Sequence, residues 1–280
     1  MVDHTKDILD DIYKVRGTTL LHLATIDGHI DAMNYLIHDI KCDINSINKD
    51  DKATPLHIAA QEGQLEAMTL LVNDYRSGID LKDIDGATPL YITARIGHVK
   101  CLELLLRYGF DACEMNHQGV TPLHIASLNG HAPIIKLLIE DGVVIDQVDH
   151  NGYTSLYFAS QYGHINIVKL LISYGADYNH ECASNGATPF YVAAKEGHND
   201  VIELLLNLKV YINERNHKGL SPLHIACQEG QLNTVKLLIQ KGAIIQNIDN
   251  NGMTPYHTAA QEGQLEIMKY LLKHGNSGNS

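Results

Sequence analysis

The sequence predicts an all-α repeat fold, a solenoid of stacked helix–turn–helix units joined by β-hairpin loops. One short motif, spelled most cleanly as GVTPLHIA at residues 119–126, occurs eight times, and successive copies begin 35, 34, 33, 33, 34, 33 and 33 residues apart. Glycine recurs after two helix-length segments in most copies, and the second of these segments has its apolar residues at helical spacing. A fixed period of 20 to 50 residues is typical of stacked repeats, so we expect one elongated domain.

The threonine position of the motif is filled by Thr19, Thr54, Thr88, Thr121, Thr154, Thr188, Ser221 and Thr254. With its TPLHxA signature and its 33-residue period, the chain resembles the ankyrin repeat family over almost its whole length. The resemblance implies an array over residues 17–275, with repeats starting near 17, 52, 86, 119, 152, 186, 219 and 252. Residues 276–280 are expected to form a flexible tail.

Residues 1–16 precede the first motif and are predicted to form a short capping helix. Ile8, Leu9, Ile12 and Tyr13 lie at helical spacing among aspartates, which indicates an amphipathic helix with an acidic outer face. Such a helix would cover the first repeat, because terminal repeats need a polar outer surface. Leu20 stands where the other repeats have proline or serine, so we expect the first repeat's helix to begin less sharply.

The fourth repeat illustrates how each unit is expected to fold. Thr121 caps a helix, and Pro122 takes the first helical position, where its missing N–H costs nothing. Leu123 faces the core, Gly130 ends the first helix, and Gly142 ends a second helix with an apolar stripe. The residues around 149–152 then turn the chain toward the next unit.

Several repeats depart from this scheme. Residues 207–209 (NLK) replace the glycine of the sixth unit, and the spacers at 74–80 and 180–186 hold extra residues. We therefore expect irregular hairpins near 73–80 and 180–185. The eighth unit is as apolar as an interior one, from which we expect a longer array or another element over that end.

Composition narrows the possible functions. The net charge is −12, and residues 1–85 hold 16 of the acids and 8 of the bases, so that end should favour a basic partner and disfavour nucleic acid. No apolar run reaches the 18 residues of a membrane span. The five cysteines are scattered, which favours neither a zinc site nor a disulfide framework, and Cys227 is expected to be a small buried residue. Without a visible signal peptide, this usage predicts a cytoplasmic protein, either a monomer or part of a longer repeat protein.

Most of the 17 histidines belong to the repeat. The family resemblance implies that histidines in the TPLH position bond backbone groups and neighbouring capping hydroxyls; they are His22, His57, His124, His224 and His257. Tyrosine replaces this histidine at Tyr91, Tyr157 and Tyr191, which leaves the local hydrogen bonding open. His117, His150 and His217 share a different position, at the predicted hairpin tips, where they could contact a partner or, less simply, a metal. No catalytic motif lies outside the repeat pattern, so we expect no enzyme activity, no cofactor and no metal.

The positions that the motif leaves free should carry the function. They are the two residues before the tip glycine, the one after it, and the pair that ends the first helix, and the resemblance places them on a concave face. The apolar residues at these positions in the third to fifth units are expected to form a contiguous exposed strip, in which Tyr153 and Tyr162 should contribute most to binding. The predicted partner-binding residues are Ile84, Asp85, Arg95, Ile96, His117, Gln118, Val120, Leu128, Asn129, His150, Asn151, Tyr153, Gln161 and Tyr162.

The seventh unit offers His217, Lys218, Leu220, Gln228 and Glu229 at the same positions. We predict a non-catalytic scaffold that binds a partner protein or peptide along this groove. Two alternatives remain open: a binding module of a secreted microbial effector that targets a host protein, and a metal or small-molecule sensor that uses the tip histidines.

Overall fold

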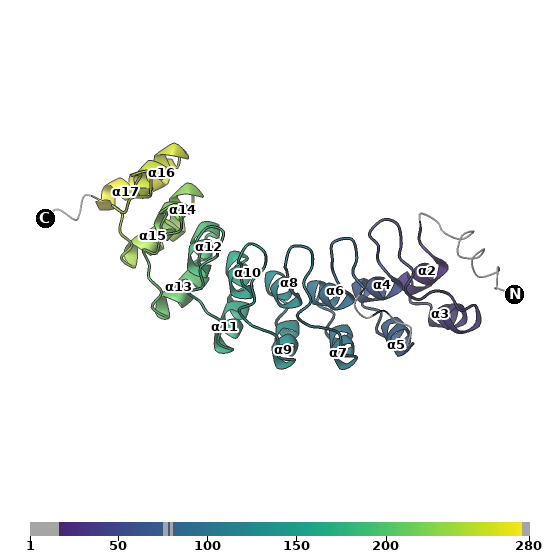
Figure 1. The fold of residues 1–280 in the computed structure, drawn as a ribbon. Helices are drawn as coiled ribbons and strands as arrows, with labels where there is room; N and C mark the ends of the chain where they lie inside the picture. The colour runs from purple at the N-terminus through teal and green to yellow at the C-terminus, as the bar shows by residue number, and fades with distance from the viewer. Residues whose placement is uncertain (1–16, 75–77, 79–80, 276–280) are drawn as a thin grey trace. The chain divides into compact units, whose positions relative to one another are not determined.

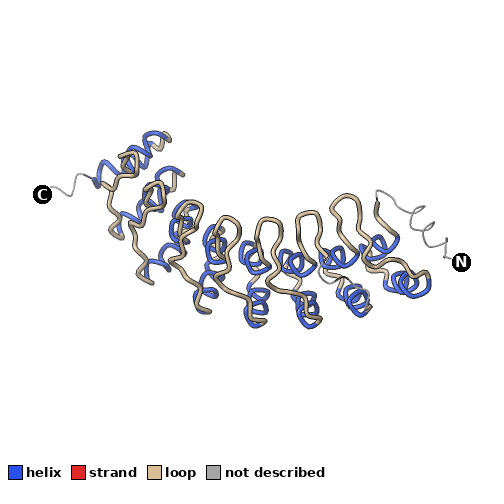
Figure 2. Tube along the Cα trace, in the orientation of Figure 1, coloured by secondary structure: helices blue, strands red, loops and turns tan. Residues whose placement is uncertain are grey.

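The computed structural model describes residues 17–74, 78 and 81–275 (Figure 1). The predicted capping helix 1–16, the tail 276–280 and most of the spacer at 74–80 lie outside the described residues. The chain divides into two compact units, Met1–Val144 and Ile145–Ser280. Over the described part it has 16 α-helices, one π-helical turn and no β-strand, which confirms the all-α prediction (Figure 2). The expected hairpin loops are closed by one or two backbone hydrogen bonds each rather than by paired strands.

In the first unit, the helices that begin within the motif lie side by side in one row. Each packs against the helix that comes next in the chain (Figure 1). The first-row helices are α2 (Leu20–Ile26), α4 (Pro55–Glu62), α6 (Pro89–Ile96) and α8 (Pro122–Leu128). The second row consists of α3 (Ile30–Asn34) continued by η1 (Tyr35–Asp39), then α5 (Leu65–Asn73), α7 (Val99–Arg107) and α9 (Ala132–Glu140).

The second unit repeats this arrangement with its own two rows of helices. Its first-row helices are α10 (Ser155–Gln161), α12 (Pro189–Glu196), α14 (Pro222–Gln228) and α16 (Pro255–Gln261). Its second-row helices are α11 (Ile165–Ser173), α13 (Asn199–Asn207), α15 (Leu232–Gln240) and α17 (Leu265–Gly275). The two rows enclose the core: on α9 in the first unit, for example, Ile134, Ile135 and Leu138 are fully buried, as the apolar stripe predicts. Cys227 is also fully buried.

Each first helix begins at the cap that the motif predicts. The Thr54 hydroxyl accepts a hydrogen bond from the His57 amide (3.4 Å), and His57 Nδ1 accepts one from the Thr54 amide (3.2 Å), which closes a capping box. Helix α2 has the same box at Thr19 and His22 although proline is missing from its first position. The expectation of a less sharp start was therefore wrong, because the threonine–histidine pair sets the cap without proline.

The irregular spacings have local explanations. The first repeat is two residues longer than the standard 33 because η1 adds one residue to its second helix and the following tip adds another. In that tip the amide of Asn48 donates to the carbonyl of Ala53, five residues later. In the next tip the amide of Asp83 donates to the carbonyl of Ala87, only four residues later. The loop at 180–185 has the same extra residue, since the Cys182 amide donates to the Ala187 carbonyl, and this confirms the irregular hairpin predicted there.

Three lysines occupy positions where other repeats have glycine. Lys41, Lys52 and Lys209 have φ angles of 60°, 58° and 66°, in the left-handed region that favours glycine. Lys209 replaces the glycine that closes a second helix, as at Gly242, where φ is 97°. The departure of the sixth unit from the motif is therefore accommodated by backbone strain rather than by a different turn.

Candidate functional site

The motif histidines join consecutive repeats. Since Nδ1 of His57 accepts from the Thr54 amide, the ring proton of the neutral imidazole is on Nε2, which donates to the Ala87 carbonyl of the next repeat at 3.1 Å. His22 and His224 make the equivalent bonds to Ala53 and Met253, both at 3.0 Å. Burial lowers the pKa of all three rings, although the carbonyl bonds oppose that effect. These histidines are structural.

A second set of polar side chains joins the repeats from the start of the second helix. His98 Nε2 lies 3.0 Å from the Gln61 carbonyl at the end of the preceding repeat's first helix. His131 and His198 pair in the same way with carbonyls of their preceding repeats, and Gln231 donates to such a carbonyl at 3.2 Å. Because a Cβ atom on Gly97 would lie 2.9 Å from the His131 ring, the glycine also makes room for this contact.

The tip histidines are exposed, and two of them also contact the preceding tip. The amide of His117 donates to the Asp85 carbonyl of the preceding tip at 3.0 Å, and the ring lies against Gly86. His217 repeats this arrangement with Asn185 and Gly186. Over the described residues, no three histidine, cysteine or acidic side chains come together in a group that could hold a metal ion.

The binding residues predicted in the first unit lie on its loop tips and at the ends of its first helices. Ile84 and Ile96 are 48% and 42% exposed. The charged and polar members Asp85, His117, Gln118 and Asn129 are also exposed, whereas Arg95, Val120 and Leu128 are half-buried. The Asn129 side chain donates to the Arg95 carbonyl at 3.2 Å and so helps to join two repeats.

In the second unit, the two tyrosines predicted to lead the site differ in environment. Tyr153 is half-buried and stacks on buried Tyr157, with ring centroids 4.3 Å apart. Tyr162, at the end of α10, is 50% exposed. His150 and Asn151 are exposed at the tip, and Gln161 is half-buried. Of these two tyrosines, Tyr162 therefore offers more of its surface to a partner.

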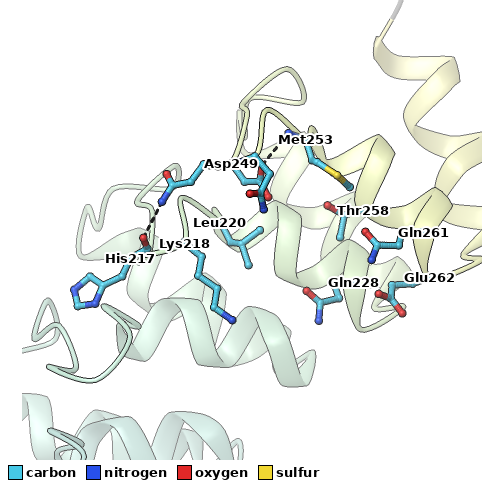
Figure 3. Close-up of a pocket in the computed structure, with 11 residues that line it drawn as sticks. His217, Lys218, Leu220, Gln228, Asp249, Met253, Thr258, Gln261 and Glu262 are labelled. Carbon is cyan, nitrogen blue, oxygen red and sulfur yellow. Dashed lines mark hydrogen bonds between the residues drawn. The ribbon is translucent and has the colours of Figure 1, made fainter.

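The structure also contains a hollow that the sequence prediction did not include. It has a volume of about 580 Å³ and lies in the second unit, between the tips of repeats seven and eight and the helices α14 and α16 (Figure 3). Its lining residues are His217, Lys218, Leu220, Gln228, Asp249, Asn250, Asn251, Met253, Thr258, Gln261 and Glu262. Four of them were recognised as free positions of repeat seven. The positions of repeat eight follow the same rule, which could have found most of the others.

The eighth repeat presents an open face. His257 Nδ1 lies 2.8 Å from the Thr254 hydroxyl, as in the other capping boxes, but the ring is exposed and its Nε2 makes no hydrogen bond to a described residue. A Cβ atom on Gly252 or Gly263 would also meet no other atom within 4 Å. Leu265 and Leu272 on α17 are 58% and 52% exposed.

Two rows of paired helices, joined by carbonyl bonds from one repeat to the next, define a helical repeat protein whose free positions gather on tips and helix ends. The family described as Ankyrin repeats (3 copies) matches residues 2–85, 67–149, 142–216 and 208–280. The chain therefore belongs to the ankyrin repeat family. Ankyrin repeats are a non-catalytic fold that generally mediates protein–protein interaction. No curated protein matches the chain significantly. Within the described residues, no helix is long and apolar enough to cross a membrane.

Proposed function

We infer that this protein is a non-catalytic scaffold that binds a partner protein or peptide on the face formed by its loop tips and first helices. The observation that carries this inference is the exposure of large apolar side chains at free positions on that face. Ile84 and Ile96 lie in the first unit and Tyr162 in the second, and each is more than 40% exposed. Exposed apolar side chains that gather on one face often mark an interaction site.

The tips are held in place before a partner arrives. Asn116 Oδ1 accepts hydrogen bonds from the amides of Gln118 and Val120, both at 2.9 Å. Asp149 Oδ1 does the same for Asn151 and Tyr153, at 2.9 and 2.8 Å. A surface that is already ordered loses little conformational entropy on binding, so more of the contact energy appears as affinity.

The test is a comparison of two exposed tyrosines. Partners are captured with the purified protein, identified by mass spectrometry, and measured again as purified proteins against the Tyr162→Ala and Tyr174→Ala variants. Tyr174 is 43% exposed but lies at the end of the second-row helix α11. We expect Tyr162→Ala to weaken binding at least about tenfold, as loss of an anchor tyrosine does, and Tyr174→Ala to leave it unchanged. Equal effects would remove the site from this face.

The charge of the partner, the location of the protein and its oligomeric state are also proposals. The acidic charge of residues 1–85 supports a partner that is basic where it meets the N-terminal end. Four buried, unlinked cysteines support a cytoplasmic location. Sedimentation of the purified protein would test the expectation of a monomer.

A further inference from the structure

The hollow of repeats seven and eight has two walls of different origin (Figure 3). Lys218 and Asn251 come from the loop tips, and Gln228 and Gln261 from the helices α14 and α16. Leu220 and Met253 contribute apolar surface between the walls. A volume of about 580 Å³ lies within the range of sites that enclose a ligand of several functional groups.

Two carboxamides in the hollow are not used by the fold. Gln228 and Gln261 make no side-chain hydrogen bond to any residue that the structure describes, whereas the Asn251 side chain is hydrogen-bonded to Asp249. Asn250, by contrast, is engaged, because its amide donates to the His217 carbonyl at 2.9 Å. A free carboxamide presents a donor and an acceptor together, which matches the C=O and N–H of a peptide backbone. Two such groups on consecutive helices favour an extended chain that runs across the repeats.

The charges beside these carboxamides are also unpaired. Glu229 and Glu262 take the same position in consecutive repeats, at the ends of α14 and α16, and both are exposed. Neither forms an ion pair within the described part of the chain. In repeat six the same position is Glu196, which Lys195 neutralises at 3.1 Å. Within the second unit, the pair of free carboxylates is thus confined to the two repeats that form the hollow, while Glu62 takes the same position in the first unit.

Basic groups near the hollow lie on the opposite wall. Arg215 is occupied, since its Nε donates to the Gly219 carbonyl at 2.9 Å. Lys218 is exposed on the tip. A bound chain would therefore meet carboxylates along the helices and a single ammonium group along the tips, which orients basic side chains toward the helices and carbonyl groups toward Lys218.

The repeat spacing sets the spacing of the ligand. Packed helices lie roughly 8–10 Å apart. A polyproline II segment rises about 3.1 Å per residue with three residues per turn, so residues three apart point the same way and lie about 9 Å apart. Successive repeats would thus meet every third residue of such a segment.

We propose that this hollow binds an extended, polyproline II-like segment of a partner protein whose basic residues, three positions apart, pair with Glu229 and Glu262. The proposal rests on the inferred scaffold function and names the chemistry of one of its partners. It is independent of the Tyr162 surface, so either can fail without the other.

Fluorescence anisotropy with a labelled 12-residue peptide tests it. The probe has Arg-Pro-Pro-Arg at its centre between serine and glycine flanks. One comparison peptide has aspartate in place of both arginines, and another has the arginines two positions apart. We expect the first peptide to bind, the second not to bind, and the third to bind several-fold more weakly.

Charge-removing variants locate the site. Glu229→Gln and Glu262→Gln should each weaken the first peptide by about 3-fold, and together by about 10-fold, as exposed ion pairs do. The matched control is Glu203→Gln, the same change at an exposed position of the second-row helix α13. The proposal is wrong if the aspartate peptide binds as well, if the control weakens binding as much, or if the first peptide does not bind at all.

Discussion

Some repeats have histidine in the TPLH position and others have tyrosine there. The two kinds are joined to the next repeat by different hydrogen bonds. In the histidine repeats, such as the second, His57 both closes the capping box and donates to the Ala87 carbonyl of the next repeat. In the tyrosine repeats, Tyr91 and Tyr191 make no capping box, and the threonine cap is one-sided. Their hydroxyls instead accept from Asn116 and Asn216 of the next tip, at 3.4 and 3.1 Å.

In most repeats the residue at the start of the next tip changes with this position; the exceptions are Asn48 after His22 and Cys182 after Tyr157. Asp83 follows His57, whereas Asn116 follows Tyr91, and the first oxygen of either side chain accepts from two tip amides. The second polar atom of the side chain is a nitrogen in asparagine and an oxygen in aspartate, and the two have different roles. The asparagine nitrogen donates to the tyrosine hydroxyl, while the aspartate charge stabilises a protonated imidazole. In the repeats that follow this rule, the joint is a pair of residues that are exchanged together within the same fold.

The largest expected effect is at a histidine joint. His57→Ala should lower the free energy of unfolding by about 2–4 kcal/mol, because it leaves the Ala87 carbonyl unpaired and opens a cavity. Urea unfolding followed by circular dichroism measures this. His29→Ala, at an exposed ring, is the control and should change little. A similar small loss at both sites would mean that the joint contributes no stability.

Acid should distinguish the two kinds of repeat. Because burial lowers the pKa of His22, His57 and His224, the unfolded chain binds more protons below its ordinary histidine pKa of 6.5. The contribution of these histidines to the free energy of unfolding is fully present above that pH, and it is lost as the pH drops below it. Urea midpoints at pH 7.5 and 5.5 should show the loss. The double variant His57→Tyr with Asp83→Asn should reduce it, and an unchanged pH dependence in that variant would contradict the account.

A smaller effect is expected at a tyrosine joint. Tyr191→Phe removes the acceptor of the Asn216 bond and should cost about 0.5–1.5 kcal/mol. Tyr211→Phe, at a ring that is 64% exposed, is the matched control. Thermal unfolding of both variants compares them, and the hydroxyl plays no part in the joint if their midpoints coincide.

The smallest effect concerns the left-handed residue of repeat six, itself a tyrosine repeat. Lys209→Gly should stabilise the protein by about 0.5–1 kcal/mol, because glycine adopts the positive φ without strain. Gly242→Ala is the converse change at a position with open space around it, and it should destabilise by about 1 kcal/mol. If both changes had the same sign, backbone strain would not distinguish these positions.

Local chemistry made much of the fold predictable from the sequence. Thr121 and Pro122 fix where a helix begins, and the period fixes which helices are neighbours. The cap of α2 was harder to foresee, since it depends on the reciprocal bond from His22 rather than on proline. The extra residue in the first repeat could be counted from its spacing, but its absorption by a π-helical turn is a property of packing.

The candidate site was less predictable because exposure depends on contacts between side chains. Position alone makes Tyr153 and Tyr162 equivalent, yet Tyr153 stacks on Tyr157 while Tyr162 remains half exposed. The hollow at Gln228 and Gln261 arises from the tips and helices of two repeats together. A list of free positions identifies its members but not the space between them.

Photo-crosslinking tests the central claim, binding through tips and first helices, most directly. A benzoylphenylalanine in place of Tyr162 or of Tyr174 reports which row of helices touches a captured partner. The account predicts that the partner is crosslinked from the Tyr162 position, on the first row, and not from the Tyr174 position, on the second. Crosslinking from the Tyr174 position alone, or equally from both, would contradict it.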